Sequence, residues 1–106
     1  KLDYAKSLLV TAIEKSTYCM ELIEPKLINW EADRVAQIDL ILLRLDLCEL
    51  LYFPTIPTKV TINEYIEIAK QYSTPQSGHF VNAVLDKILK DLEKDKKINK
   101  QDRLPR

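Results

Sequence analysis

Apolar residues recur at helical spacing along most of the chain. One stripe runs through residues 2–28, residues 30–52 cover two adjacent helix faces, and residues 61–72 and 80–92 each carry a further stripe. The pattern predicts an all-α fold without a sheet. The stripes are Ala5, Leu8, Ala12, Cys19, Ile23 and Leu27, then Val35, Ile38, Leu42 and Leu45 with the adjacent face Ile41, Cys48 and Tyr52, then Ile62, Tyr65, Ile66, Ala69 and Tyr72, then Phe80, Val81, Val84, Leu85, Ile88 and Leu92.

Prolines and capping residues mark the boundaries of these helices. Pro25 should kink or restart the first helix, and the two prolines of FPTIP should end the central helix, because proline lacks the backbone N–H that a helix requires. Thr61 and Glu64 have the T-x-x-E spacing of a capping box, which predicts that the third helix begins there.

The last predicted helix also has a local start signal. Within STPQS, Thr74 can cap the helix while Pro75 occupies its first position, where a missing N–H does no harm. After residue 92 the sequence has little apolar surface to bury. We therefore expect residues 1–92 to form one helical domain and residues 93–106 to form a charged tail.

Composition and charge narrow the possible functions. The 106 residues suffice for one modest core, and 16 basic residues balance 16 acidic residues. The chain therefore lacks the basic excess that supplies general affinity for nucleic acid. The apolar run from residue 38 to residue 53 contains four charged residues, which excludes a membrane span. Cys19 and Cys48 have no CxxC spacing and no signal peptide opens the chain, so we expect reduced thiols in the cytoplasm.

Catalytic and metal-binding motifs are missing from the sequence. It has a single histidine and no glycine-rich phosphate loop, metal-spaced cluster or nucleophile elbow. We therefore expect neither an enzyme nor a cofactor. The acidic residues of the central helix are expected to pair with Arg34, Arg44 or nearby lysines, because buried carboxylates need partners. They are Asp39, Asp46 and Glu49.

The stretch from Leu42 to Ile88 resembles the C-terminal signature of the NusB family of transcription antitermination factors. It contains an LR…EL helix, the sequence IPTKVTINEYIEIAK and the sequence SGHFVNAVLD, in the family's order and spacing. The first helix and Trp30 fit the family's variants from Bacteroides-like bacteria. The resemblance implies an all-helical fold of two small bundles and no catalysis. It also implies binding of boxA-type RNA together with NusE, a ribosomal protein, within the RNA polymerase antitermination complex.

The sequence departs from the family pattern in two places. NusB proteins carry an arginine-rich first helix, and this chain begins at Lys1 on a helical pattern without such a segment, so we expect a fragment of the family fold. Ala83 replaces the glycine usual in FVNGVLD. FVNAVL also occurs in the NusB-like accessory domain of ribosomal RNA cytosine methyltransferases, where arginine commonly follows; here Asp86 follows, which favours the antitermination branch. A helical interaction module without a nucleic-acid role is the third alternative.

The resemblance also suggests which residues carry function. Phe80 lies at the edge of an apolar face, where it could be core or an exposed anchor for a partner protein, and the resemblance favours the anchor. The polar pairs at helix starts or on polar faces are expected to bond neighbouring backbone and fix how helices meet. The predicted protein-partner residues are Asp39, Glu49 and Phe80, the residues expected to make weak RNA contacts are Lys59, Lys70, His79, Lys87 and Lys90, and the signature residues are Asn63, Glu64, Asn82 and Asp86.

Overall fold

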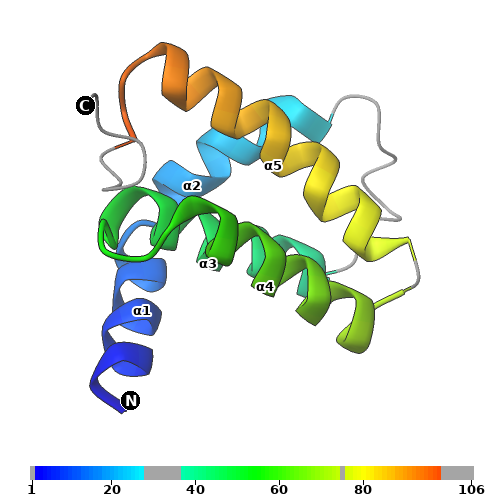
Figure 1. The fold of residues 1–106 in the computed structure, drawn as a ribbon, viewed down its shortest axis with the longest axis horizontal. Helices are drawn as coiled ribbons and strands as arrows, with labels where there is room; N and C mark the ends of the chain where they lie inside the picture. Colours follow the sequence, from blue (N-terminus) through cyan, green and yellow to red (C-terminus); the bar gives the residue numbers. More distant parts are fainter. Residues whose placement is uncertain (1, 28–36, 75, 99–106) are drawn as a thin grey trace.

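The computed structural model describes residues 2–27, 37–74 and 76–98. Within these residues every regular element is helical, which confirms the predicted all-α class (Figure 1). The elements are α1 (Leu2–Glu14), α2 (Ser16–Ile23), the 3₁₀ helix η1 (Glu24–Leu27), α3 (Gln37–Tyr52), α4 (Thr58–Tyr72) and α5 (Ser77–Lys94).

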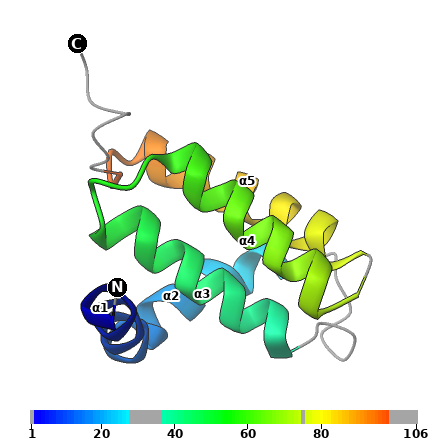
Figure 2. The ribbon, with the colours of Figure 1, turned by 60° about the horizontal axis from the view of Figure 1, so that its bottom comes forward.

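The helices α3, α4 and α5 run back and forth beside one another, while α1 projects from one end of the molecule (Figures 1 and 2). The segment formed by α2 and η1 packs against α3 and α5. An ion pair of 2.5 Å between Lys26 Nζ and Asp91 Oδ2 ties η1 to α5. Most of the chain therefore packs around α3.

The core is built from α2, α3, α4 and α5, whereas α1 and η1 contain no buried residue. In α4 the buried positions are Thr58, Thr61, Tyr65 and Ala69, whereas Tyr72 is 69% exposed. The buried face of α4 is therefore rotated by part of a turn from the predicted apolar stripe. The buried apolar residues are Cys19, Ile23, Leu42, Leu43, Leu47, Cys48, Leu50, Tyr65, Ala69, Phe80, Val81, Val84, Leu85, Ile88, Leu89 and Leu92.

The first helical stretch breaks ten residues before the predicted position. Lys15, with φ −102° and ψ 11°, separates α1 from α2, and its ammonium group lies 5.5 Å from the ring centroid of Tyr52. The break lets α1 contact α3 while α2 buries Cys19 and Ile23. The α-helix then gives way to η1 just before Pro25, as expected for a residue without an N–H.

The predicted capping box at Thr61 is wrong. The helix α4 begins one turn earlier, at Thr58 after Pro57, and the backbone N–H of Thr61 already donates to the carbonyl oxygen of Pro57 at 3.2 Å. The side chain of Thr61 is fully buried and bonds to Glu49 on α3 rather than to the backbone of its own helix. A tertiary contact thus uses the hydroxyl that the local motif assigned to a cap.

The boundaries of α5 also differ from the prediction. The helix begins at Ser77, whose hydroxyl accepts a 3.1 Å bond from the backbone N–H of Thr74; Pro75 lies outside the described residues. At the other end, α5 continues to Lys94, so the predicted tail begins within the helix. The predicted start of the central helix near Trp30 lies outside the described residues, as does Arg34.

The C-terminus of α5 is closed by backbone hydrogen bonds. The N–H of Lys97 donates to the carbonyl of Leu92 at 2.8 Å, and the N–H of Lys96 donates to the carbonyl of Glu93 at 3.1 Å. Lys96 adopts a left-handed conformation with φ 57°. These are the bonds of a Schellman motif. The following Ile98 packs against the core, so the chain remains attached beyond the helix end.

Candidate functional site

Glu49 is the centre of a polar cluster between α3 and α4. Its side chain is buried, and its two oxygens accept hydrogen bonds from two hydroxyls of α4. Thr61 Oγ1 donates to Oε1 at 3.0 Å, and the Tyr65 hydroxyl donates to Oε2 at 2.7 Å. The donors are hydroxyls, so the predicted pairing of this carboxylate with arginine or lysine is wrong.

The tyrosines around Glu49 are held in their protonated form. Burial raises the pKa of Tyr65, and the hydrogen bond to Glu49 and its negative charge raise that pKa further. Burial and a hydrogen bond to Glu49 likewise raise the pKa of Tyr4 on α1. The ring of Tyr4 also meets Phe53 edge-on, with centroids 5.4 Å apart. Three helices therefore converge on one carboxylate.

A pocket of about 410 Å³ opens beside this cluster. Glu49 and Tyr65 supply polar atoms from the buried side, and the exposed Glu64 lies among the lining residues. Val60, which is 48% exposed, adds apolar surface. The lining residues are Tyr4, Leu8, Glu49, Ile56, Val60, Glu64, Tyr65 and Ile68. The pocket combines apolar walls with two carboxylates, which suits the aliphatic stem and charged head of a basic side chain.

Asp39 joins the first turns of α3 and α5. Its Oδ2 accepts a 3.0 Å hydrogen bond from Ser77 Oγ, which also lies 2.8 Å from Ser73 Oγ and 2.9 Å from Thr74 Oγ1. Asp39 is 4% exposed. The carboxylate stands near the N-terminus of α5, where the helix dipole favours negative charge. Its observed role is to connect helices, and its partner is again a hydroxyl rather than a cation.

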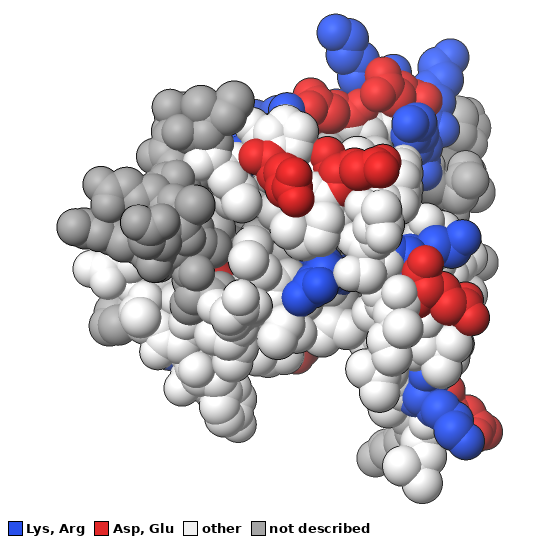
Figure 3. Space-filling model, turned by 180° about the vertical axis from the view of Figure 1, so that it is seen from behind, with Lys and Arg blue, Asp and Glu red and all other residues white. Residues whose placement is uncertain are grey.

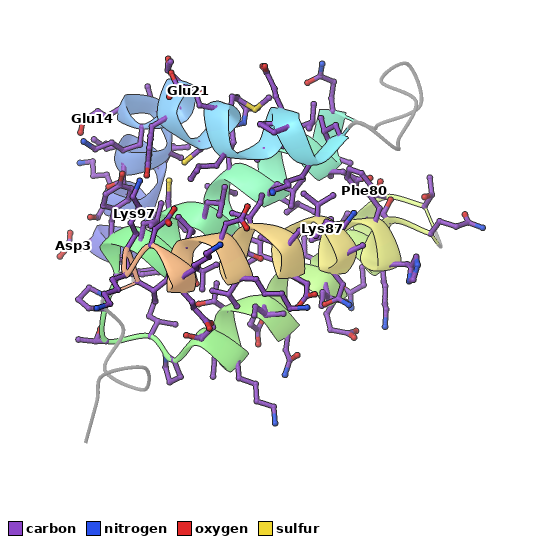
Figure 4. The ribbon with its side chains drawn as sticks, turned by 90° about the horizontal axis from the view of Figure 1, so that it is seen from above. Asp3, Glu14, Glu21, Phe80, Lys87 and Lys97 are labelled. Carbon is purple, nitrogen blue, oxygen red and sulfur yellow. The ribbon has the colours of Figure 1, made fainter. Side chains whose placement is uncertain are left out.

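Phe80 belongs to the core. It is 5% exposed and comes from the first turn of α5, as Figure 4 shows. The interpretation of Phe80 as an exposed anchor is therefore wrong, and the alternative of a core position is the one the fold adopts. The physical reason is that the α5 stripe is wider than its helical wheel indicates, because α2, α3 and α4 all contact this helix.

The predicted RNA residues are all exposed, on α4 and α5. Lys70 Nζ lies 3.5 Å from Glu67 Oε1, and Lys90 Nζ lies 2.9 Å from Asp86 Oδ2. Exposed pairs of this kind are weak and leave the cation available to other anions. Lys59 and His79 stand near the starts of α4 and α5, and Lys87 lies further along α5 (Figure 4).

The four signature residues lie on exposed faces. Asn63 and Glu64 occupy the second turn of α4 instead of its start, and Asn82 and Asp86 face outward from α5. Asp86 contacts Lys90 of its own helix. Because all four side chains are exposed, they do not fix how the helices meet, contrary to the expectation. Helix contacts of that kind are made by Glu49 and Asp39, together with the hydroxyls of α4 and α5 that bond to them.

A second, apolar groove lies between α1 and α3. It measures about 420 Å³ and contains Leu9 and Ile13, which are 58% and 69% exposed, and Ile41, which is 45% exposed. Arg44 reaches across it to donate a 3.1 Å bond from Nη1 to Ser16 Oγ. Leu45 also lines this groove and is only partly buried, so its predicted position in the core is confirmed only in part. Figure 3 shows the molecule from behind, where uncharged side chains cover much of the surface.

The described residues offer neither a metal centre nor a membrane span. They contain no group of three or more His, Cys, Asp or Glu side chains placed to hold a metal ion. None of the helices they form has both the length and the apolar character needed to cross a membrane.

Comparison with known proteins gives the family. The NusB family model matches residues 1–90. The chain belongs to the NusB family. It is 46% identical over 101 residues to the transcription antitermination protein NusB of Salinibacter ruber, a match that covers 95% of this chain and 63% of the relative. Over 92 residues it is 39% identical to NusB of Clostridium perfringens, covering 87% of this chain and 68% of the relative.

A solved NusB structure shares the fold. NusB from T. maritima superimposes with a TM-score of 0.77 at 40% sequence identity, covering 84% of this chain and 63% of the other. The predicted NusB-type helical architecture is confirmed by this likeness. The chain spans about two thirds of the length of the NusB proteins that it matches.

The sequence did not reveal the hydroxyl groups of α4 that bond to Glu49. Thr58, Thr61 and Tyr65 follow one another at spacings of a single helix face, but the T-x-x-E spacing of Thr61 and Glu64 led to the interpretation of Thr61 as a cap. Treating threonine as a core residue at helical spacing would have extended the α4 stripe to its true start. The contact with Glu49 also requires the position of α3, which no local pattern supplies.

Proposed function

We propose that this NusB-family chain acts in transcription antitermination as a non-catalytic adaptor in the cytoplasm. It binds boxA-type RNA jointly with a NusE-type ribosomal protein and so joins the RNA polymerase antitermination complex. The observation that carries the proposal is the family match over residues 1–90, together with relatives that are named transcription antitermination proteins. Those names support the adaptor over the accessory domain of an RNA methyltransferase.

The pocket beside Glu49 is the proposed contact for the ribosomal protein. All three residues predicted to meet a partner are buried, but Glu49 also lines a pocket that opens to solvent. A basic side chain entering the pocket would lie along Val60 and approach Glu49 and Glu64. Complementary charge of this kind increases association rate and specificity. Asp39 and Phe80 then support the surface by holding α5 in place.

A titration with the NusE-type ribosomal protein tests this contact. Val60→Asp places a charge at the apolar wall of the pocket and should weaken binding at least tenfold. The matched control is Tyr72→Asp, because Tyr72 is also an exposed apolar residue of α4 but lies about 18 Å further along the helix. Equal affinities for the two variants would move the contact away from the pocket. Circular dichroism checks that both variants keep their helices.

The RNA contact is proposed for the exposed basic residues of α4 and α5, with a modest contribution. The chain has no net charge, and two of the four lysines already have acidic neighbours, so few counterions are released on binding. We expect this chain alone to bind boxA-like RNA weakly. A NusB protein with the arginine-rich first helix should bind more tightly and with a steeper dependence on salt. Titrations at two salt concentrations measure both quantities.

The groove between α1 and α3 has the apolar character of a surface that packs against another helix. Its exposed Leu9, Ile13 and Ile41 form an apolar surface, and the relatives are about half as long again as the matched region. We propose that a further helical segment of the NusB fold packs there, such as the arginine-rich first helix of NusB proteins. Protection of α1 amide hydrogens from exchange should rise when that segment is present. Unchanged protection would place the segment elsewhere.

A further inference from the structure

The two cysteines of the chain meet in the core. Cys19 comes from α2 and Cys48 from α3, 29 residues apart in sequence, and their sulfur atoms lie 3.9 Å apart. Both side chains are fully buried and both are free thiols. Because the chain contains only two cysteines, any disulfide within one molecule must join this pair.

The surroundings make the two thiols unequal. Arg44 lies one helical turn before Cys48 and bonds to Ser16, which lies one turn before Cys19. A hydrogen bond from Cys48 and the positive charge of Arg44 lower the pKa of Cys19, although burial opposes them. The hydrogen bond to Cys19 and burial raise the pKa of Cys48. The positive charge of Arg44 favours the thiolate of Cys19, and the thiolate is the reactive form.

We infer that Cys19 and Cys48 form a reversible disulfide when the protein meets a small peroxide, which creates an oxidation site that joins α2 to α3. The inference rests on the contact between the two buried sulfurs and on the cation beside them. It does not depend on the proposed role in antitermination. Disulfides of intracellular proteins are commonly of this transient, redox-sensing kind.

The chemistry balances with one peroxide for each disulfide. The thiolate of Cys19 attacks one peroxide oxygen, the O–O bond breaks, and the released hydroxide takes up a proton to become water. This leaves Cys19 as a sulfenic acid. The sulfur of Cys48, losing its proton, then attacks the sulfur of Cys19, and the hydroxyl group leaves as a second water molecule. Two thiols are oxidised and one peroxide is reduced.

The geometry needs only a small adjustment. A disulfide requires sulfurs about 2 Å apart, so the sulfurs must approach by about 2 Å from their present positions. Rotation of the two side chains supplies much of this movement without a change of fold. Oxidant reaches the pair by local opening of α2, a helix of eight residues that buries only Cys19 and Ile23. Short elements with few buried residues open more readily than the core.

The reduced wild-type protein is treated with hydrogen peroxide, denatured, and analysed for free thiols and intact mass. We expect the loss of both thiols, a mass lower by two hydrogen atoms, and a single monomeric band without reductant. Dithiothreitol should restore both thiols. The oxidised form should melt at a temperature several degrees higher, because the cross-link restricts the unfolded chain.

Two variants and one condition complete the test. Cys19→Ala and Cys48→Ala should show no mass loss within one chain and no rise in melting temperature after peroxide. A low urea concentration that leaves the helical spectrum intact should accelerate oxidation of the wild type, because it favours opening of α2. Retention of both thiols would overturn the inference, as would disulfides only between chains or stable oxygen adducts at the cysteines. Those outcomes concern the wild type and do not depend on whether the variants fold.

Discussion

Thr61 and Glu49 lie twelve residues apart in the sequence, and the hydroxyl of Thr61 donates a 3.0 Å hydrogen bond to Oε1 of the glutamate. Both side chains are buried, so the bond satisfies a carboxylate that α3 carries into the interior. It fixes the rotation of α4 against α3 at the wall of the proposed partner pocket. The stability of this domain and the shape of its candidate site therefore depend on the same atoms.

Thr61→Val tests the importance of that bond. Valine has nearly the shape of threonine but no donor, so Glu49 keeps a buried oxygen without this partner. The free energy of unfolding should fall by about 1 to 3 kcal/mol, as measured by urea denaturation. The converse change, Val60→Thr, affects an exposed neighbour and should remain within about 0.5 kcal/mol of the wild type. A neutral Thr61→Val would show that water or another group replaces the hydroxyl.

Tyr65→Phe should change the response to alkaline pH. The folded protein raises the pKa of Tyr65 above its ordinary value of about 10, through burial and through Glu49. Below pH about 10 both states keep the proton, but above it the unfolded chain releases its proton while the folded chain does not. Stability should therefore fall as the pH rises, and Tyr65→Phe should make that fall shallower. Urea denaturation between pH about 8 and about 11 measures it.

The control for that experiment is Tyr72→Phe. Tyr72 is 69% exposed on the same helix, so its hydroxyl is not held by the core. The Tyr72 variant should keep the wild-type slope of stability against pH. Equal slopes for all three proteins would mean that Glu49 does not hold the proton of Tyr65 in the folded state.

Phe80→Ala should unfold the protein more easily, because Phe80 is buried among α5 and its neighbours. Removing a buried phenylalanine side chain typically costs about 3 to 5 kcal/mol, a large part of the stability of a small domain. Tyr72→Ala removes an exposed aromatic side chain and should cost less than about 0.5 kcal/mol. Thermal melting of both variants makes the comparison. A fully stable Phe80→Ala protein would restore the interpretation of Phe80 as a surface anchor.

Lys96→Gly should stabilise the protein. Lys96 has a φ of 57°, a left-handed conformation that costs a residue with a Cβ atom about 1 to 2 kcal/mol and costs glycine almost nothing. The gain in unfolding free energy should be about 0.5 to 1 kcal/mol after the greater entropy of glycine in the unfolded chain is subtracted. Lys97→Gly, one residue later, should be neutral or destabilising. A loss of stability in Lys96→Gly would mean that the Schellman closure is not the dominant conformation.

Much of the helical architecture was already encoded locally. The apolar stripe of residues 80–92 predicts α5 and its buried face, and the prolines of FPTIP predict the end of α3 at Tyr52. The signature from Leu42 to Ile88 also led to the family that the comparisons show. These features are accessible because helix periodicity, missing N–H groups and motif spacing involve residues close together in the chain.

The tertiary structure alone decided which polar groups became partners. Thr61 has the local appearance of a cap, yet α3 brings Glu49 within reach of its hydroxyl, and that contact places Thr61 in the core. Cys19 and Cys48 look unrelated in sequence, but the break at Lys15 turns α2 so that the two sulfurs meet. Such contacts join residues 12 and 29 positions apart, so they depend on how whole helices pack rather than on any pattern within one helix.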